Sequence, residues 1–251
     1  MIGAIIFLFC FGLDLIAHEF VLRLKYIFDR KNILEYFNRF QAKRTEAIYG
    51  YARFYTGFRL YIESNLKQPL PKSFIIVANH RSLVDIAAIL YAFRNYGVRF
   101  VAKKQLKYGI PTISLGARIG QHALIDRKGN FASTYRELIK LAKRTSRGLC
   151  PVVFPEGTRS RTGEIGNFHS AAVRLLVEHS NVPILSVALY GERKMVTFKE
   201  LLKNMKNASY RVKLLTLYDH PKGRKATTRL LDEIREEISR QVKEWETKSK
   251  V

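Results

Sequence analysis

The chain has 251 residues, of which 47% are hydrophobic, so it can bury the core of one sizeable domain, and general disorder is excluded. Its two cysteines, Cys10 and Cys150, exclude a disulfide scaffold and a zinc site built from thiolates. The 44 lysine and arginine residues outnumber the 21 acidic residues and give a formal net charge of +23, which predicts an anionic partner such as nucleic acid, an acidic membrane surface or a phosphorylated small molecule.

An apolar run opens the chain at Ile2–Leu13 and is followed by Asp14, His18 and Glu19. The run is shorter than the roughly 20 apolar residues that a transmembrane helix needs. It also lacks the preceding basic residues and the small-residue cleavage site of a signal peptide. The pattern therefore predicts an apolar helical segment, without indicating that it spans a membrane.

Apolar and basic residues alternate at helical spacing from Phe20 to Arg44. The apolar positions are Phe20, Leu24, Ile27, Leu34 and Phe37, and the residues between them include seven lysines and arginines, at 23, 25, 30, 31, 39, 43 and 44. An apolar face beside a basic face is typical of a helix that lies in a membrane interface, although an ordinary core-packing helix gives a similar pattern. We expect residues 1–65 to form an N-terminal apolar and amphipathic segment that anchors the protein to the cytoplasmic face of a membrane.

After a linker at Leu66–Pro71, which contains two prolines, short apolar runs alternate with helical patterns. The apolar runs are Phe74–Ala78, Val98–Ala102, Ala123–Ile125, Pro151–Phe154, Ile184–Leu189 and Val212–Leu217. The helical patterns lie near Leu83–Phe93, Phe131–Lys143, Ala171–Val177 and Phe198–Met205, and a last one contains Leu231, Ile234, Ile238, Val242 and Trp245. This alternation predicts an α/β domain over residues 70–251, with a mainly parallel central sheet and helices on both faces.

Polar residues follow four of the predicted strands at their carboxyl ends. They are Asn79 with His80, Lys103 with Lys104, Asp126 with Arg127, and Glu156 with Arg159. Parallel strands bring their carboxyl ends to one edge of the sheet, where ligands usually bind. The sequence therefore predicts that an imidazole, a carboxylate and several cations meet at this edge.

The stretch FIIVANHRSLVD places His80 five residues before Asp85. A neutral imidazole can act as a base near neutral pH when a carboxylate holds its other ring nitrogen, as in the histidine–aspartate half of a serine-protease triad. No clear nucleophile accompanies the pair, because Ser82 lies between its members and Cys150 lies just before a buried strand. This favours a substrate that brings its own hydroxyl group.

A purely structural explanation exists for both clusters. Ser82 and Asp85 also fit a helix-capping box, in which Asp85 favours the positive end of the helix. Glu156–Arg159 alone is compatible with a turn that contains a local ion pair. The joint appearance of the two clusters at neighbouring strand ends favours the catalytic interpretation.

NHRSLVD, followed further along the chain by FPEGTRS, resembles the glycerol-phosphate acyltransferase superfamily, and most of all the 1-acylglycerol-3-phosphate (lysophosphatidate) acyltransferases. His80 and Asp85 match the HxxxxD pair of the family, and Phe154–Ser160 match its FPEGTRS block without a change. VAKKQLKYGIP is similar to the KxEL-then-proline block, and ALIDR to the strand that ends in arginine. The chain departs from the family pattern at Gln105, Gln121, His169, Ala171 and Ser186.

The resemblance implies an acyltransferase that moves an acyl group from acyl-CoA or acyl-carrier protein to the free hydroxyl of 1-acylglycerol-3-phosphate, giving phosphatidate. His80 is then the general base, Asp85 orients it, and backbone amides near Ser82 are candidates to stabilise the oxyanion.

The resemblance also implies a substrate-binding set made of Lys103, Arg127, Glu156, Gly157, Thr158 and Arg159. The three cations bind the phosphate of the acceptor. Glu156 holds a glycerol hydroxyl or anchors Arg159, and Gly157 permits a close backbone approach.

We expect no cofactor beyond the acyl donor, because the chain has no P-loop or GxGxxG motif, and no metal, because His18, His122, His179 and His220 lack ligand spacing. The expected partners are the acyl thioester donor, a lysophospholipid acceptor and an anionic membrane surface, without nucleic acid. Alternative functions are acyl transfer to glycerol-3-phosphate or another lysolipid, an inactive membrane-binding relative, and a basic nucleic-acid-binding protein. The last lacks an RNA- or DNA-recognition motif and leaves the apolar N-terminus unexplained.

Overall fold

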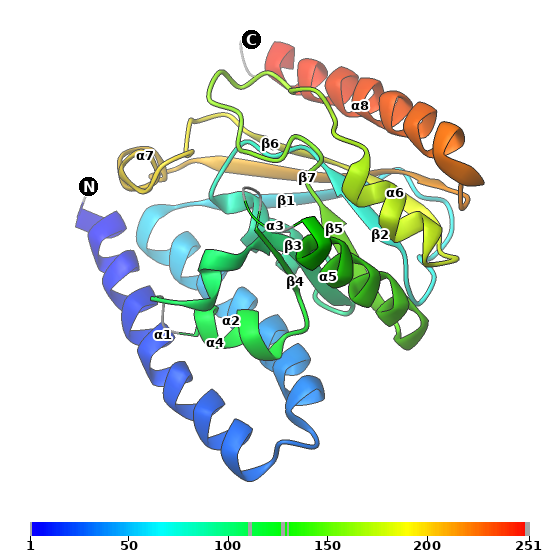
Figure 1. Cartoon of the computed structure of the whole chain (residues 1–251). Coiled ribbons are helices and arrows are strands. Elements are labelled where there is room, and N and C mark those ends of the chain that lie inside the picture. The colour runs from blue at the N-terminus through cyan, green and yellow to red at the C-terminus, as the bar shows by residue number, and fades with distance from the viewer. Residues whose placement is uncertain (1, 110–111, 127–128, 130, 249–251) are drawn as a thin grey trace.

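A seven-stranded sheet forms the centre of the part of the chain that the structure describes, which comprises residues 2–109, 112–126, 129 and 131–248 of a computed structural model (Figure 1). The strands are β1 (Arg59–Ser64), β2 (Ile75–Ala78), β3 (Gly97–Lys103), β4 (Ala123–Ile125), β5 (Leu149–Val153), β6 (Ile184–Gly191) and β7 (Ser209–Tyr218), in the spatial order β1-β7-β6-β2-β5-β3-β4. Every neighbouring pair is parallel except β6 and β7. The predicted mainly parallel sheet is confirmed.

Helices cover both faces of this sheet. They are α1 (Ile2–Phe28), α2 (Ile33–Thr56), α3 (Val84–Ala92), α4 (Ile113–Ile119), α5 (Phe131–Lys143), α6 (Ala171–Glu178), α7 (Phe198–Asn204) and α8 (Gly223–Lys248), with short 3₁₀ helices at Lys104–Lys107 and Arg144–Arg147. Side chains of β2 alternate between two cores: Ile76 and Ala78 pack towards α2 and α3, whereas Ile75 and Val77 pack towards α5, α6 and α8. Figure 1 shows α8 on the side of the molecule opposite α1 and α2.

The N-terminal region differs from the prediction in two ways. The single helix expected across Phe20–Arg44 is wrong, because a turn at residues 29–32 separates α1 from α2. Phe20 and Ile27 are exposed, but Phe37 is buried in a small cluster with other apolar side chains from α1 and α4. Strand β1 was not predicted; it pairs in parallel with β7 at the edge of the sheet.

Helix α1 is longer than its opening apolar run indicated. It has 27 residues, and by length and composition it is the one helix of the described residues that could cross a membrane. Its two acidic residues near the centre are both paired: Asp14 accepts a hydrogen bond from Arg44 of α2 at 2.8 Å, and Glu19 accepts one from the backbone amide of Thr112 at 2.6 Å. These contacts fix one side of α1 to the protein.

A partly buried polar network attaches the C-terminal helix to the sheet. The hydroxyl groups of Ser186, Thr216 and Tyr218 on β6 and β7 all donate to the carboxylate of Glu237 on α8. Ser186, which departs from the family pattern, is fully buried and contributes to this network.

Candidate active site

The NHRSLVD and FPEGTRS motifs meet because the strands that precede them are neighbours. β2 and β5 run in parallel side by side, so Asn79–His80 after β2 and Phe154–Ser160 after β5 emerge at the same edge of the sheet. Asn79 fixes the end of β2 to the end of β6, since its side chain donates to the carbonyl of Leu189 and accepts from the Leu189 amide. The amide of Ser160 donates to the carbonyl of His80 at 2.8 Å and ties the two loops together.

The predicted histidine–aspartate pair is formed. Nδ1 of His80 lies 2.6 Å from Oδ2 of Asp85, and the same oxygen accepts hydrogen bonds from the backbone amides of Arg81 and Ser82 at 2.8 and 2.9 Å. Asp85 stands in the first turn of α3 and is fully buried. One carboxylate therefore holds the imidazole and closes the loop before α3. The predicted capping box is formed only in part, because the Ser82 hydroxyl accepts from the amide of Val84 and the N-cap residue Leu83 has no side-chain cap.

A tyrosine that the motifs do not contain completes the environment of Asp85. The hydroxyl of Tyr210, at the start of β7, donates to Oδ1 of Asp85. Gly191 on the neighbouring strand makes room for the tyrosine ring, since a Cβ there would lie 2.7 Å from a ring carbon. Burial, and then the charge of Asp85, raise the pKa of Tyr210 well above its usual value, so the hydroxyl remains protonated and donates at physiological pH.

Sequence reasoning missed Tyr210 because it lies 125 residues from Asp85, in a strand with no recognisable motif. A second phenol, Tyr49 of α2, points its buried hydroxyl into the same region, and burial and the charge of Asp85 raise its pKa as well. Neither residue has a sequence signal beyond its aromatic character.

Glu156 has a role that the sequence analysis did not propose. Its Oε1 accepts from the backbone amide of His80 at 2.7 Å, and its Oε2 accepts from the amide of Gly166 at 3.0 Å. Burial raises the pKa of Glu156, against the opposing effect of these two amides. Glu156 thus holds the loop that carries the imidazole, with one backbone amide on each of its carboxylate oxygens, and it is not among the residues that line the large cavity beside His80.

A cavity of about 700 Å³ opens beside His80 and extends between α5 and α6. The ring of His80 lines it and stacks on Phe154, with 4.2 Å between the ring centroids. Of the predicted substrate-binding residues, the structure brings Lys103, Gly157, Thr158 and Arg159 to the wall of this cavity. Arg127 lies outside the described residues. Most of the remaining wall is apolar, including Ile86, Phe100, Val101, Leu106, Ile125, Tyr135 and Leu138.

Two details of the FPEGTRS turn refine the prediction. Arg159 donates from Nη1 to the carbonyl of Val196 at 2.5 Å, which holds its guanidinium at the cavity wall. Gly157 has φ +71°, and a Cβ there would meet nothing closer than a ring carbon of His169 at 3.9 Å. The backbone conformation of the turn, rather than a close approach, therefore favours glycine at this position.

The expected oxyanion donors near Ser82 are already used within the protein. The amides of Arg81 and Ser82 donate to Asp85, that of Leu83 to the carbonyl of Met195, and that of Val84 to the hydroxyl of Ser82. That assignment is therefore wrong for these amides, because each already has an acceptor.

The two candidate nucleophiles near the His80–Asp85 pair, Ser82 and Cys150, are both engaged within the protein. The hydroxyl of Ser82 donates to the carbonyl of Met195, and Cys150 is fully buried in β5, where burial raises the pKa of its thiol to about 11. Among the described residues, no group of three or more His, Cys, Asp or Glu side chains is arranged to hold a metal ion. The geometry suits proton transfer from a hydroxyl group that enters the cavity.

Comparison with known proteins identifies the family. A family model described as Acyltransferase matches residues 58–190, which is more than half of the chain and includes both motifs. The chain belongs to this acyltransferase family. The solved structure of the 1-acyl-sn-glycerophosphate (LPA) acyltransferase PlsC from Thermotoga maritima shares the fold, with a TM-score of 0.73, 23% identity and coverage of 98% of this chain and 95% of that one.

Relatives of this acyltransferase carry related names. A probable 1-acyl-sn-glycerol-3-phosphate acyltransferase from Mycoplasma genitalium is 31% identical over 57% of this chain and 55% of its own length. The 1-acyl-sn-glycerol-3-phosphate acyltransferase of Cocos nucifera is 32% identical over 47% of this chain and 37% of its own length. The chain thus spans about half or less of the length of each of these relatives.

Replacing Tyr210 with phenylalanine tests the contribution of its hydroxyl group. We expect Tyr210→Phe to lower kcat of acyl transfer about tenfold, because a hydrogen bond to a charged group is lost, while KM for both substrates stays within about twofold. The matched control is Tyr218→Phe on the same strand, which removes a hydroxyl that contacts Glu237 instead. Equal kcat values for the two variants in a steady-state assay would contradict a role for Tyr210 in positioning Asp85.

Proposed function

We propose that this acyltransferase transfers an acyl group from an acyl thioester, either acyl-CoA or acyl-carrier protein, to the free hydroxyl of 1-acylglycerol-3-phosphate, giving phosphatidate. The observation that carries the proposal is the His80–Asp85 pair at the wall of a large, mostly apolar cavity that also presents Lys103 and Arg159. The names of the relatives from Mycoplasma genitalium and Cocos nucifera support the same acceptor.

His80 is the general base in this proposal. Asp85 holds Nδ1 of the ring, so Nε2 takes the proton of the acceptor hydroxyl as the hydroxyl oxygen attacks the thioester carbonyl carbon. The carbon–sulfur bond then breaks, and the imidazolium returns its proton to the leaving thiolate. An ester and a free thiol are formed, and the histidine is again neutral. The buried Asp85 stabilises the imidazolium between the two proton transfers.

In this proposal, charged residues of the cavity wall bind the phosphate of a substrate, and its apolar surface binds acyl chains. Arg159 and Lys103 supply positive charge for the phosphate of the acceptor, and the sequence motif adds Arg127 to this set. The apolar wall between α5 and α6 suits the acyl chain that the donor brings, and that of a lysophospholipid acceptor. No metal or cofactor is required by the proton transfers described above.

A membrane is the proposed source of the acceptor. The outer side of α1 exposes an apolar stripe along its whole length, formed by Ile2, Ile5, Ile6, Phe9, Leu13, Ile16, Phe20, Val21, Leu24, Ile27 and Phe28. The opposite side is held to α2 and to Thr112, so we infer that α1 lies along the cytoplasmic surface of the membrane rather than crossing it. The net charge of +23 adds attraction to anionic lipid.

A product assay tests the activity and the base together. The purified protein, supplied with labelled acyl-CoA or acyl-carrier protein and a panel of 1-acylglycerol-3-phosphate, glycerol-3-phosphate and other lysolipids, is expected to give labelled phosphatidate by mass spectrometry. His80→Ala should lower the rate by about 10²-fold or more, since base catalysis is lost.

The control for this substitution is His220→Ala, at a histidine that contacts the carbonyl of Val182 instead of the cavity. Circular dichroism should show both variants folded. A parent enzyme that acylates only glycerol-3-phosphate would replace the proposed acceptor, and a His80→Ala rate within a fewfold of the parent would refute the base assignment.

Polar substitutions on the exposed side of α1 test the membrane contact. We expect Phe9→Ser/Phe20→Ser to remain folded and to lose sedimentation with anionic vesicles, because both rings are about two-thirds exposed. Tyr61→Ser/Ile62→Ser removes two exposed apolar side chains from edge strand β1 and should bind vesicles like the parent. Unchanged sedimentation of the α1 variant would defeat this assignment.

A further inference from the structure

A second cavity of about 130 Å³ borders the loop between His80 and Val84, and its wall is more polar than that of the large cavity. Its wall carries the basic side chains Arg81, Arg161, Arg193 and Lys194, with Glu192 as its acidic residue. We name it the basic cavity. Ser82 lines both the basic cavity and the large one, so the loop between His80 and Val84 separates the two spaces.

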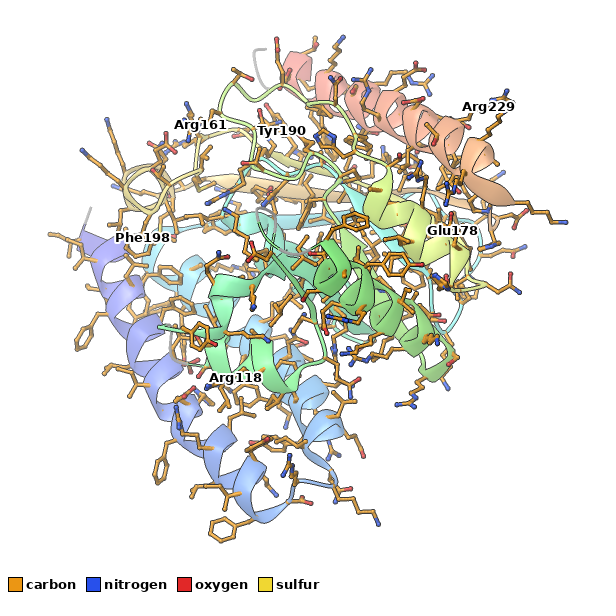
Figure 2. All side chains as sticks on the ribbon, in the orientation of Figure 1. Arg118, Arg161, Glu178, Tyr190, Phe198 and Arg229 are labelled. Carbon is orange, nitrogen blue, oxygen red and sulfur yellow. The ribbon has the colours of Figure 1, made fainter. Side chains whose placement is uncertain are left out.

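The cations of the basic cavity have few close polar partners, although the guanidinium of Arg81 also lies over the ring of Tyr190, 4.7 Å from its centroid. Nη1 of Arg81 is buried and makes no hydrogen bond within the described part of the chain; the carboxylate of Glu246 lies 3.7 Å away. Lys194 lies 3.9 Å from Glu200, which is the limit of an ion pair, and Arg193 donates to the backbone carbonyl of Lys206. Arg161 is exposed and extends from the loop after the FPEGTRS turn (Figure 2).

The walls of the basic cavity are the same segments that hold the catalytic pair. Ser160 lines it and donates its amide to the carbonyl of His80, and Tyr210 lines it and donates to Asp85. Val196 lines the basic cavity from the loop after β6, and its carbonyl accepts a hydrogen bond from the guanidinium of Arg159. A ligand in this cavity therefore contacts the loops that form the reaction site, and the two cavities lie on either side of Ser82.

We propose that the basic cavity binds a phosphate group of one of the two acyl-transfer substrates, at a site separate from Arg159 and Lys103. The proposal rests on the proposed function for the identity of the ligand, because both substrates carry phosphate. The acceptor has one on its glycerol, and an acyl thioester of coenzyme A or of a carrier protein has at least one on its phosphopantetheine arm. Guanidinium and ammonium groups with few protein partners suit such an anion.

The test removes two of these cations and leaves the catalytic residues intact. Arg161→Gln/Lys194→Gln is compared with Lys225→Gln/Arg229→Gln, which removes the same charge from exposed positions on α8 (Arg229 is labelled in Figure 2). KM for donor and acceptor are measured separately in detergent micelles at two salt concentrations. Binding of inorganic pyrophosphate to each protein is measured by calorimetry without turnover.

We expect the cavity variant to show an increase of about tenfold in KM for one substrate, with kcat within about twofold, and to bind pyrophosphate about tenfold more weakly. Its KM should also depend less steeply on salt. A rise confined to the donor assigns the cavity to a phosphate of the donor, and a rise confined to the acceptor assigns it to the glycerol phosphate. The α8 variant should behave like the parent.

Parent-like KM values and pyrophosphate binding in the cavity variant would overturn the inference, and so would equal losses in both variants. Failure of the proposed function has a different result, because the parent protein then forms no acylated lipid with any acceptor. Pyrophosphate binding that depends on Arg161 and Lys194 would still identify an anion site in that case.

Discussion

The rest of the site depends on the hydrogen bonds that the carboxylate of Asp85 accepts. This carboxylate is fully buried and accepts hydrogen bonds from an imidazole, two backbone amides and a phenol. A buried carboxylate is costly unless its oxygens are satisfied, so these donors must be present together. The same bonds fix the backbone after β2, the ring of His80 and the first turn of α3. The proposed chemical role of Asp85 and its structural role therefore depend on the same hydrogen bonds.

A second carboxylate holds the histidine from the other strand. Glu156 follows β5 and accepts a hydrogen bond from the backbone amide of His80, while Asp85 accepts one from the imidazole ring of the same residue. His80 is thus positioned through its backbone by Glu156, in the loop after β5, and through its side chain by Asp85, in the first turn of α3. This explains physically why the NHRSLVD and FPEGTRS motifs occur together: each is incomplete without the neighbouring strand end.

Much of this arrangement was predictable from local patterns. The six apolar runs after the linker all became strands, and the rule that parallel strands share one ligand-binding edge brought His80 and Arg159 to the same cavity wall. Tyr210 was not predictable, because its contact with Asp85 depends on the antiparallel return of β7 beside β6 and on the space over Gly191. The turn between α1 and α2 was missed because the helical spacing of apolar residues continues across it, and the pairing of β1 with β7 depends on residues far along the chain.

The central claim is that His80 and Asp85 act as one unit on a substrate hydroxyl, and a double-mutant cycle tests it most directly. Rates of acyl transfer are measured for His80→Ala, Asp85→Asn and the double variant, each confirmed to be folded. If Asp85 acts through the imidazole, the double variant should be no slower than His80→Ala alone. Losses that multiply in the double variant would contradict the account, because Asp85 would then contribute to the reaction independently of the histidine.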